Sequence, residues 1–246
     1  MISFRGVSKA FGERRVLDAV SFEIHPGEVF FIIGGSGVGK SVLIKHLIGL
    51  VRCDAGEIRV DGQDVTRLSE AELFPVRTRC AMVFQHSTLF DSMTCAENVA
   101  LPLRKHRALD VPSALTEARR LLAAVDMDAH ADRLPAELGD GMRKRVAIAR
   151  ALALEPRHVL FDEPTTSLDP VSARRVDRLI QRLSKQQGVT SVVVSHDLAS
   201  IFGIADRIVM LYKGSVRLIG TPDEFRASKD AVVEQFVNGR AEGPID

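Results

Sequence analysis

Short apolar runs alternate with helical patterns along most of this chain. The apolar runs have the length and composition typical of strands that are buried on both faces of a sheet. They cover residues 29–33, 80–84, 158–161, 191–194 and 207–211. Helical patterns near residues 170–186 and 197–204 separate the last three of them. This alternation predicts βαβ units around a parallel core sheet, and therefore an α/β fold.

The N-terminal part of the chain has a different pattern, in which apolar and polar residues alternate. Residues 16–24 predict a strand that ends at the turn His25-Pro26-Gly27. Residues 57–60 predict a further strand, followed by an Asp-Gly turn. A short helix is expected over residues 69–74, with Pro75 closing it.

Helical periodicity fills the chain from about residue 86 to 155, between two of the core strands. One amphipathic helix is expected to start just after Pro112, and another to run from about Asp140 to Leu154. We therefore expect one domain over residues 1–220, with a helical subdomain inserted at about 86–155. Residues 221–246 are expected to form a C-terminal helix and tail.

Composition and charge exclude several classes of protein. Hydrophobic residues make up 46% of the 246 residues, which is ample for a core. Lys plus Arg total 33 and Asp plus Glu total 32, so the net charge is +1, which argues against a nucleic-acid binder. The three cysteines form no Cys-x-x-Cys pair and suit a reducing compartment. Since no run approaches the ~20 apolar residues of a membrane span, we expect a soluble protein, or one held at a membrane by a partner.

A glycine-rich segment between the first core strand and the following helical pattern carries the clearest chemistry. It reads Gly34-Gly35-Ser36-Gly37-Val38-Gly39-Lys40-Ser41, with Val42 continuing into the helix, and it fits the P-loop pattern G-x-x-x-x-G-K-[ST]. Backbone N–H groups of such a loop surround a phosphate chain, and the helix adds its positive end. Lys40 is expected on the β- and γ-phosphates, and the Ser41 hydroxyl on Mg²⁺. An ordinary glycine turn is the alternative.

Two adjacent carboxylates follow the strand at residues 158–161. Asp162 has the position of a residue that holds Mg²⁺ through water. Glu163 points in another direction, so it is a candidate to orient or deprotonate the attacking water. A solvated acidic turn would look the same, but the P-loop earlier in the chain favours a second half of an ATPase site.

With these motifs in place, the whole chain resembles the ATP-binding cassette (ABC) ATPases. The further motifs occur in the family's order along the chain. They are Phe11 (the adenine-stacking aromatic), the P-loop, Gln85 (the Q-loop glutamine, near Mg²⁺ and the water), Leu138-Gly139-Asp140-Gly141-Met142 (the signature), Asp162 and Glu163, Ser167-Leu168-Asp169 (the D-loop) and His196 (the switch histidine). Each minor motif is weak alone, and their joint order carries the resemblance.

The resemblance implies an architecture and an assembly. The fold would be a P-loop NTPase core with a mainly parallel sheet, an N-terminal antiparallel β subdomain and an inserted α-helical subdomain. Two copies would form a head-to-tail homodimer, in which the P-loop of one subunit and the signature of the other enclose each ATP. Signature residues 139–142 would then contact the nucleotide of the partner subunit.

The signature departs from the family's usual Leu-Ser-Gly-Gly-Gln. Gly139 replaces the serine whose hydroxyl meets the γ-phosphate, and Asp140 replaces a glycine. A carboxylate about 4 Å from a phosphate charge would be repelled by about 4 kcal/mol at an effective dielectric near 20. A helix cap contributes only about 1 kcal/mol. We therefore expect Asp140 to turn away and cap its helix, and the enzyme to be active with modest turnover.

Three segments are similar to one subgroup, the Mla/Mce-type phospholipid-transport ATPases. They are residues 85–103, the basic run Arg143-Lys144-Arg145, and a tail that contains a predicted helix over 230–237 and Gly243-Pro244. In the subgroup such a tail reaches the other ATPase subunit, so 221–246 is expected to be a dimer contact. The resemblance implies integral-membrane permease subunits, an Mce-domain lipid-binding protein, and a place on the cytoplasmic face of the inner membrane. An ATPase of a small-solute importer, or a non-transport ABC protein such as a divisome regulator, is the alternative.

Overall fold

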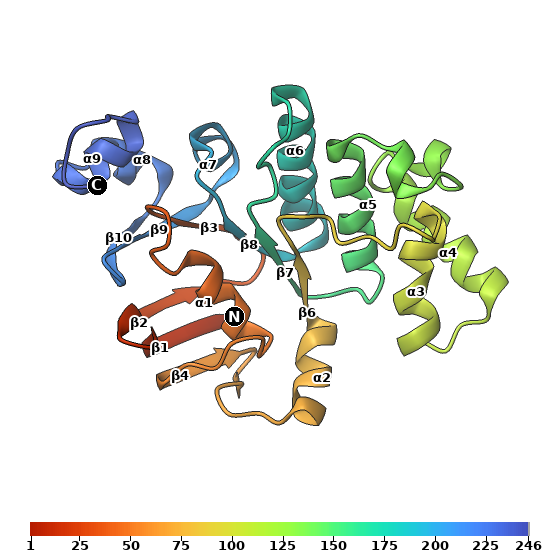
Figure 1. The fold of residues 1–246 in the computed structure, drawn as a ribbon, viewed down its shortest axis with the longest axis horizontal. Coiled ribbons are helices and arrows are strands. Elements are labelled where there is room, and N and C mark those ends of the chain that lie inside the picture. Colours follow the sequence, from red (N-terminus) through yellow and green to blue (C-terminus); the bar gives the residue numbers. More distant parts are fainter. Residues whose placement is uncertain (246) are drawn as a thin grey trace.

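A six-stranded sheet forms the centre of the computed structural model, which describes residues 1–245 (Figure 1). Its strand order is β10-β9-β3-β8-β7-β6. The bounds are β3 Val29–Ile33, β6 Cys80–Val83, β7 His158–Asp162, β8 Thr190–Val194, β9 Arg207–Tyr212 and β10 Ser215–Gly220. All neighbours run parallel except β10, which pairs antiparallel with β9. The expected parallel core is confirmed, and β10 is a strand that the sequence pattern did not predict.

An antiparallel sheet of four strands, in the order β2-β1-β4-β5, covers one face of the central sheet. The bounds are β1 Ile2–Phe11, β2 Arg14–Ile24, β4 Ala55–Val60 and β5 Gln63–Asp64. Helix α1, Lys40–Leu47, lies between the two sheets. Phe4, Phe22 and Phe30 form a continuous aromatic contact from β1 through β2 to β3. The predicted N-terminal antiparallel sheet is therefore present, with longer strands than the pattern indicated.

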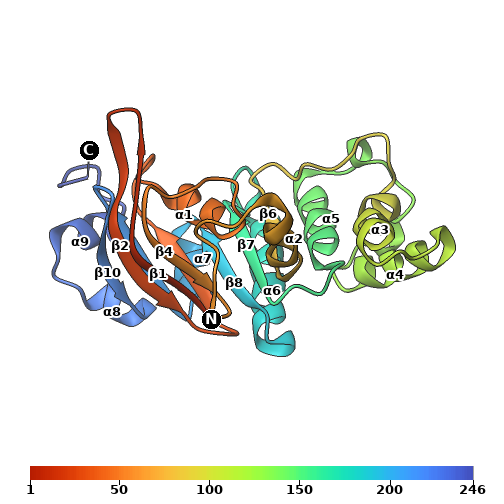
Figure 2. The ribbon, with the colours of Figure 1, turned by 90° about the horizontal axis from the view of Figure 1, so that it is seen from below.

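Helices cover the other face of the central sheet and extend beyond it. Successive residues of β3 alternate between the two cores: Phe30 and Ile32 face the antiparallel sheet, whereas Phe31 and Ile33 face the helices. The segment between β6 and β7 forms α3 Cys95–His106, α4 Val111–Ala123, α5 Asp140–Leu152 and the short 3₁₀ helices Asp128–His130 and Pro135–Glu137. Helices α3, α4 and α5 stand at one end of the molecule, side by side with α6, Pro170–Gln187 (Figures 1 and 2).

The C-terminal segment lies at the opposite end. Helix α7, Leu198–Ile204, precedes β9, and α8, Pro222–Ala227, and α9, Ala231–Asn238, follow β10 (Figure 1). Val232 and Val233 of α9 are buried, so this helix is part of the hydrophobic core. The predicted helix over 230–237 corresponds to α9.

Two prolines lie inside helices that the sequence pattern placed beside them. Helix α2, Glu70–Arg79, continues through Pro75, so the prediction that Pro75 closes this helix is wrong. A capping box between Ser69 and Glu72 and the burial of Val76 offset the hydrogen bond that proline removes. Helix α4 begins at Val111 rather than after Pro112, because Asp110 caps it and proline is well tolerated in a first turn.

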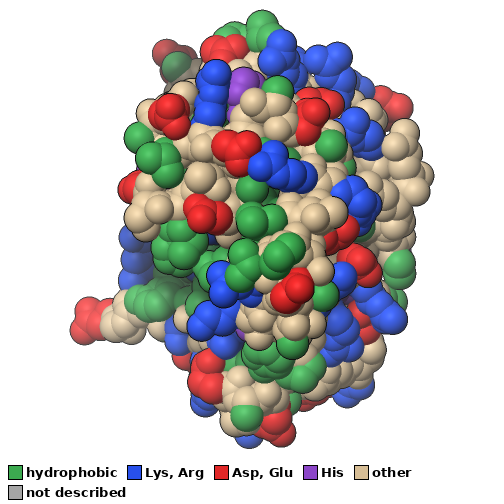
Figure 3. Space-filling model, turned by 90° about the vertical axis from the view of Figure 1, so that its right-hand side faces the viewer, with side chains coloured by type: hydrophobic (Ala, Val, Ile, Leu, Met, Phe, Trp, Pro, Cys, Tyr) green, Lys and Arg blue, Asp and Glu red, His purple; other side chains and the backbone are tan. Residues whose placement is uncertain are grey.

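The surface carries charges of both signs. On the end formed by the helical segment, Lys and Arg side chains are interspersed with Asp and Glu, and hydrophobic side chains gather near the middle (Figure 3). The exposed apolar residues of this segment are Phe90, Val111 and Leu134. Within residues 1–245, no helix has the length and apolar character that crossing a bilayer requires.

Candidate functional site

The carboxyl ends of four parallel strands bring the predicted site residues to one edge of the sheet. The P-loop follows β3, Gln85 follows β6, Glu163 follows β7 and His196 follows β8. A cleft of about 710 Å³ opens at this edge. The predicted residues that line it are Phe11, Gly34, Gly35, Ser36, Gly37, Gly39, Lys40, Ser41, Val42, Gln85, Glu163 and His196. Val38 instead packs its side chain against the hydrophobic core below the loop.

The backbone of the P-loop requires its glycines. Gly34, Gly37 and Gly39 have φ angles of 139°, 70° and 105°, which other residues rarely adopt. A Cβ on Gly39 would lie 2.6 Å from Leu17 Cδ2, and a Cβ on Gly34 would collide with the Leu211 carbonyl oxygen. Helix α1 starts directly after Gly39, and no side chain caps its first N–H groups. These N–H groups therefore remain available to an anion.

Lys40 supplies the positive charge of the cleft. Its Nζ donates hydrogen bonds to the carbonyl oxygens of Gly34 and Gly35, both at 2.9 Å, so the ammonium lies over the loop. Burial lowers the pKa of Lys40, and the carboxylates of Glu163 and Asp162 oppose that shift. The lysine is thus desolvated and already close to the acidic half of the site, which strengthens its attraction to phosphate oxygens.

Ser41 and Asp162 form a pair of oxygen ligands with the character that Mg²⁺ prefers. The Ser41 hydroxyl donates to Asp162 Oδ1 at 2.6 Å, and the aspartate is buried at the end of β7. One hydroxyl and one carboxylate are the protein ligands expected of Mg²⁺ bound with a nucleotide, because the ion then takes most of its ligands from phosphates and water. The residues present therefore fit Mg²⁺.

Glu163 and His196 contact each other across the cleft. His196 Nδ1 and Glu163 Oε2 are 2.9 Å apart, and the Thr166 hydroxyl donates to the same carboxylate oxygen at 3.0 Å. Glu163 has a φ of 49°, in the left-handed region, and its N–H bonds to the Val194 carbonyl oxygen. Glu163 lines the cleft, whereas Asp162 is buried at the end of β7. The carboxylate is accordingly placed to accept a proton from a water molecule beside the phosphates.

The signature residues lie elsewhere. Gly139, Asp140, Gly141 and Met142 line a separate depression of about 460 Å³, together with Ser167, Leu168 and Asp169. None of the P-loop residues lines it. The P-loop cleft and the signature depression are therefore two separate surfaces of one chain, with no lining residue in common.

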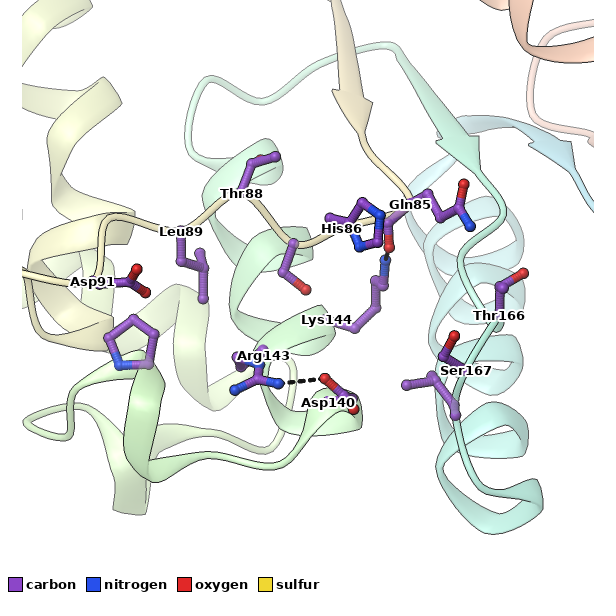
Figure 4. Close-up of a pocket in the computed structure, with 13 residues that line it drawn as sticks. Gln85, His86, Thr88, Leu89, Asp91, Asp140, Arg143, Lys144, Thr166 and Ser167 are labelled. Atoms are coloured by element: carbon purple, nitrogen blue, oxygen red, sulfur yellow. Dashed lines mark hydrogen bonds and ion pairs between the residues drawn. The ribbon is translucent and has the colours of Figure 1, made fainter.

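Asp140 does not cap α5, so that part of the sequence prediction is wrong. Gly139 is the N-cap residue and Asp140 is already inside the first turn. The Asp140 carboxylate instead forms an ion pair with Arg143, one turn further along α5 (Figure 4). Gly139 has no side chain to cap the helix, so the N–H groups of Asp140 and Gly141 keep no capping partner, whereas the Met142 N–H donates to the Gly139 carbonyl oxygen. Arg143 compensates the acidic charge of Asp140.

Three residues outside the predicted set, Arg14, Val16 and Phe236, also line the P-loop cleft. Arg14 and Val16 of β2 line the P-loop cleft with Phe11, and Arg14 donates to the Gly37 carbonyl oxygen. Arg14 and Val16 are two residues apart on β2, so they lie on the same face of a strand that begins just after Phe11, and this spacing could have predicted their place in the cleft. Lys144, the middle residue of the basic run Arg143-Lys144-Arg145, is buried. Phe236 from α9 also lines the cleft, although the tail was expected on a partner subunit.

Comparison with known protein families gives one match, to the ABC transporter model over residues 17–166. The chain belongs to the ABC transporter family. It is the ATP-binding and ATP-hydrolysing subunit, because the matched region contains the P-loop and both acidic residues after β7.

Relatives of this ABC ATPase are similar over its full length. It is 38% identical over 245 residues to the "Intermembrane phospholipid transport system ATP-binding protein MlaF" of Escherichia coli (strain K12), covering 100% of this chain and 91% of that protein. It is 37% identical over 244 residues to the "Probable ribonucleotide transport ATP-binding protein mkl" of Mycobacterium tuberculosis (strain ATCC 25618 / H37Rv), covering 99% of this chain and 68% of that protein.

Solved structures give the same fold. The ATP-binding cassette MJ0796, solved as a dimer in a post-hydrolysis state with ADP and Pi, matches with a TM-score of 0.82 and 33% identity over 90% of this chain and 99% of that chain. CbiO1 of Clostridium perfringens matches with a TM-score of 0.85 and 27% identity, over 98% of this chain and 95% of that one. The predicted fold class is thereby confirmed.

We expect Glu163→Gln to retain ATP binding and to lower turnover by about 10²–10⁴-fold, because the amide cannot accept the proton of the attacking water. Calorimetric titration with ATP and a phosphate-release assay on the same preparation measure both quantities. Thr166→Val serves as the control, since it removes the hydroxyl contact to Glu163 but keeps the carboxylate. Turnover of Glu163→Gln within a few-fold of the parent would exclude this role.

Proposed function

We propose that two copies of this ABC ATPase pair head to tail and power phospholipid transport through separate membrane subunits. The observation that carries the dimer is the separation of the P-loop cleft from the signature depression on one chain. The uncapped N–H groups of Asp140 and Gly141 at the start of α5 suit an anion that the P-loop cleft of the same chain does not hold. A second chain, rotated by a two-fold axis, completes both sites at once.

Within each completed site, the side chains of the cleft divide the work. Phe11, half exposed at the end of β1, stacks on the adenine, and Lys40 binds the β- and γ-phosphates. Ser41, Asp162 and Gln85 would hold Mg²⁺, which when bound would offset the charge of the phosphates. Glu163 orients the attacking water, and His196 keeps Glu163 in place and contacts the γ-phosphate. Gly139, Asp140, Gly141 and Met142 form the signature that the partner subunit brings to this nucleotide, with the uncapped N–H groups of Asp140 and Gly141 facing the phosphates.

Coupling to a permease is assigned to the segment that follows Gln85. Ser87, Thr88, Leu89 and Asp91 line a depression of about 360 Å³ next to the signature helix, and Phe90 lies between them in the sequence (Figure 4). Phe90 is half exposed, and both its N–H and its carbonyl oxygen bond to the buried Asn98, so the loop presents an apolar group on a rigid support. An exposed apolar residue beside a groove suits a short helix of a membrane subunit.

The transported substrate is proposed from the relatives. Identity of 38% over the whole chain to MlaF favours phospholipid transport, a permease, an Mce-domain lipid-binding protein, and a place on the cytoplasmic face of the inner membrane. The relative from M. tuberculosis, at 37%, is named for ribonucleotide transport, so import of a small anionic solute is the second candidate.

The tail is proposed to contact the partner subunit at the nucleotide. A Cβ on Gly35 would lie 3.7 Å from Ile245 Cγ2, and the Tyr212 hydroxyl donates to the Pro244 carbonyl oxygen at 2.8 Å. The Gln235 side chain bonds to the backbone of Ile245 in both directions. These contacts place the tail on its own chain, beside the cleft that the partner's signature must cover. It therefore stands at the edge of the proposed dimer interface.

A truncation after Gly239 tests the tail. We expect it to weaken ATP-dependent dimerisation several-fold while the protein still folds, because Val232 and Val233 of the core are retained. The melting temperature should fall by only a few degrees, since the buried Gln235 loses its hydrogen bonds to Arg240 and Ile245. Sedimentation with ATP and thermal unfolding of the same protein give the two readouts. Unchanged dimerisation would show that residues 240–246 are only a terminus.

The ion pair between Asp140 and Arg143 in the signature can be tested by substitution. Arg143→Ala leaves the Asp140 carboxylate uncompensated beside the partner's phosphates, so turnover should fall by several-fold or more. Asp140→Gly should change turnover at most several-fold, and the double variant should regain most of the activity that Arg143→Ala loses. Phosphate-release assays on the three variants decide this. Equal losses in Arg143→Ala and in the double variant would show that the pair has no electrostatic role.

The transport proposal is tested on the assembled complex. A tagged copy, expressed in the source organism, should co-purify with integral-membrane subunits and with bound phospholipid, identified by mass spectrometry. In vesicles, the complex should move labelled phospholipid in an ATP-dependent manner, and Glu163→Gln should abolish that movement. Transport of a ribonucleotide without lipid movement would favour the second candidate, and the absence of any membrane subunit would overturn the proposal.

A further inference from the structure

Lys144 is a buried cation with no carboxylate partner in the part of the chain that the structure describes. It lies on α5, shortly after the signature, and is 2% exposed. Its Nζ donates to the carbonyl oxygens of Phe84 at 2.9 Å and of Gln85 at 2.6 Å. Figure 4 shows the contact with Gln85. Burial lowers the pKa of Lys144 to about 8, against the opposing effect of Asp162 and Asp140.

Burial of the Lys144 ammonium lowers the stability of the folded protein, so packing alone does not explain a lysine at this position. Burying an ammonium costs several kcal/mol after relaxation, and carbonyl dipoles recover only part of it. An apolar side chain of similar length would fill the same space on α5 without that cost. What the ammonium adds is two directed hydrogen bonds to the backbone at the end of β6.

Arg150, farther along α5, holds the next part of the same segment. Its guanidinium donates to the Thr88 carbonyl oxygen at 2.9 Å, to Thr88 Oγ1 at 3.1 Å and to the Ser87 carbonyl oxygen at 3.3 Å. Residues 85–88 belong to no helix or strand, and in residues 1–245 the hydrogen bonds that reach them from other elements all come from these two cations. The path of the segment is therefore set by α5.

This arrangement links two functional groups of one subunit. The Gln85 side chain lines the P-loop cleft with Lys40 and Glu163, while its carbonyl oxygen is bound by the helix that begins with the signature. A shift of α5 is transmitted to the Gln85 backbone through hydrogen bonds rather than through a flexible loop. A displacement of about 1 Å at such a group can change a rate by up to about 100-fold.

We propose that Lys144 is a positioning residue for Gln85: its ammonium fixes the Gln85 backbone to the signature helix, so that the Gln85 side chain reaches the Mg²⁺ and water positions only when α5 is correctly placed. This inference rests on ATP hydrolysis by this family and is independent of the transported substrate. Removal of the ammonium should therefore release the loop and lower turnover through Gln85, while ATP binding at the P-loop persists.

Four variants test the proposal: Lys144→Met, Lys144→Arg, Gln85→Ala and the double variant Lys144→Met/Gln85→Ala. Lys144→Met should lower kcat by about 10- to 100-fold with less than a few-fold change in the KM for ATP. Lys144→Arg should restore most of the loss, since a guanidinium also donates to two carbonyl oxygens. In the Gln85→Ala background, Lys144→Met should cost no more than about two-fold, because the group that it positions is already absent.

A second readout does not depend on turnover. Hydrogen–deuterium exchange of the amides in 84–91 should rise in Lys144→Met and stay near the parent in Lys144→Arg, without a general rise elsewhere. Lys105→Met, which removes an exposed lysine from α3, controls for the loss of one cation. If Lys144→Met does not fold, Lys144→Gln, which keeps a donor without the charge, takes its place.

Two results would overturn the inference. One is an equal loss of kcat from Lys144→Met in the parent and in the Gln85→Ala background, because the lysine would then act independently of Gln85. The other is parental kcat and parental exchange of residues 84–91 in Lys144→Met, because the ammonium would then not hold the segment at all.

Discussion

The parallel alignment of β3, β8, β7 and β6 is the constraint on which the rest of this molecule depends. Parallel strands end at the same edge of a sheet, so this alignment alone brings together residues that are far apart in the chain. The P-loop, Gln85, Glu163 and His196 each follow one of these strands. Both cores serve this alignment, because alternate residues of the strands pack against the antiparallel sheet on one face and against helices on the other.

The negative charge of a triphosphate determines where cations and carboxylates lie at this edge of the sheet. A triphosphate must be surrounded by N–H groups and cations, while the carboxylates that hold Mg²⁺ and direct water stay a short distance away. Lys40 lines the cleft, and Asp162 lies buried at the end of β7, where it accepts a hydrogen bond from Ser41. At the signature the same problem recurs with Asp140, and there Arg143 supplies the compensation locally.

Much of this could be predicted from the sequence, because the chemistry is encoded in contiguous motifs. The P-loop glycines, Lys40 and the Asp162-Glu163 pair are read directly, and the apolar runs predict the parallel sheet. Other features depend on contacts between distant segments. Pro75 lies inside α2 because capping and burial outweigh its local effect. The partners of Asp140 and Lys144 could not be predicted, because a basic run on a helix does not show which side chains turn inward.

The account depends on one claim above all, that each nucleotide is bound between two chains. Sedimentation velocity of Glu163→Gln, which should bind ATP without turning it over, tests this most directly. The account predicts a monomer without nucleotide and with ADP, and a dimer of twice the mass with ATP and Mg²⁺. A chain that binds ATP with normal affinity and remains a monomer at every concentration examined would contradict it.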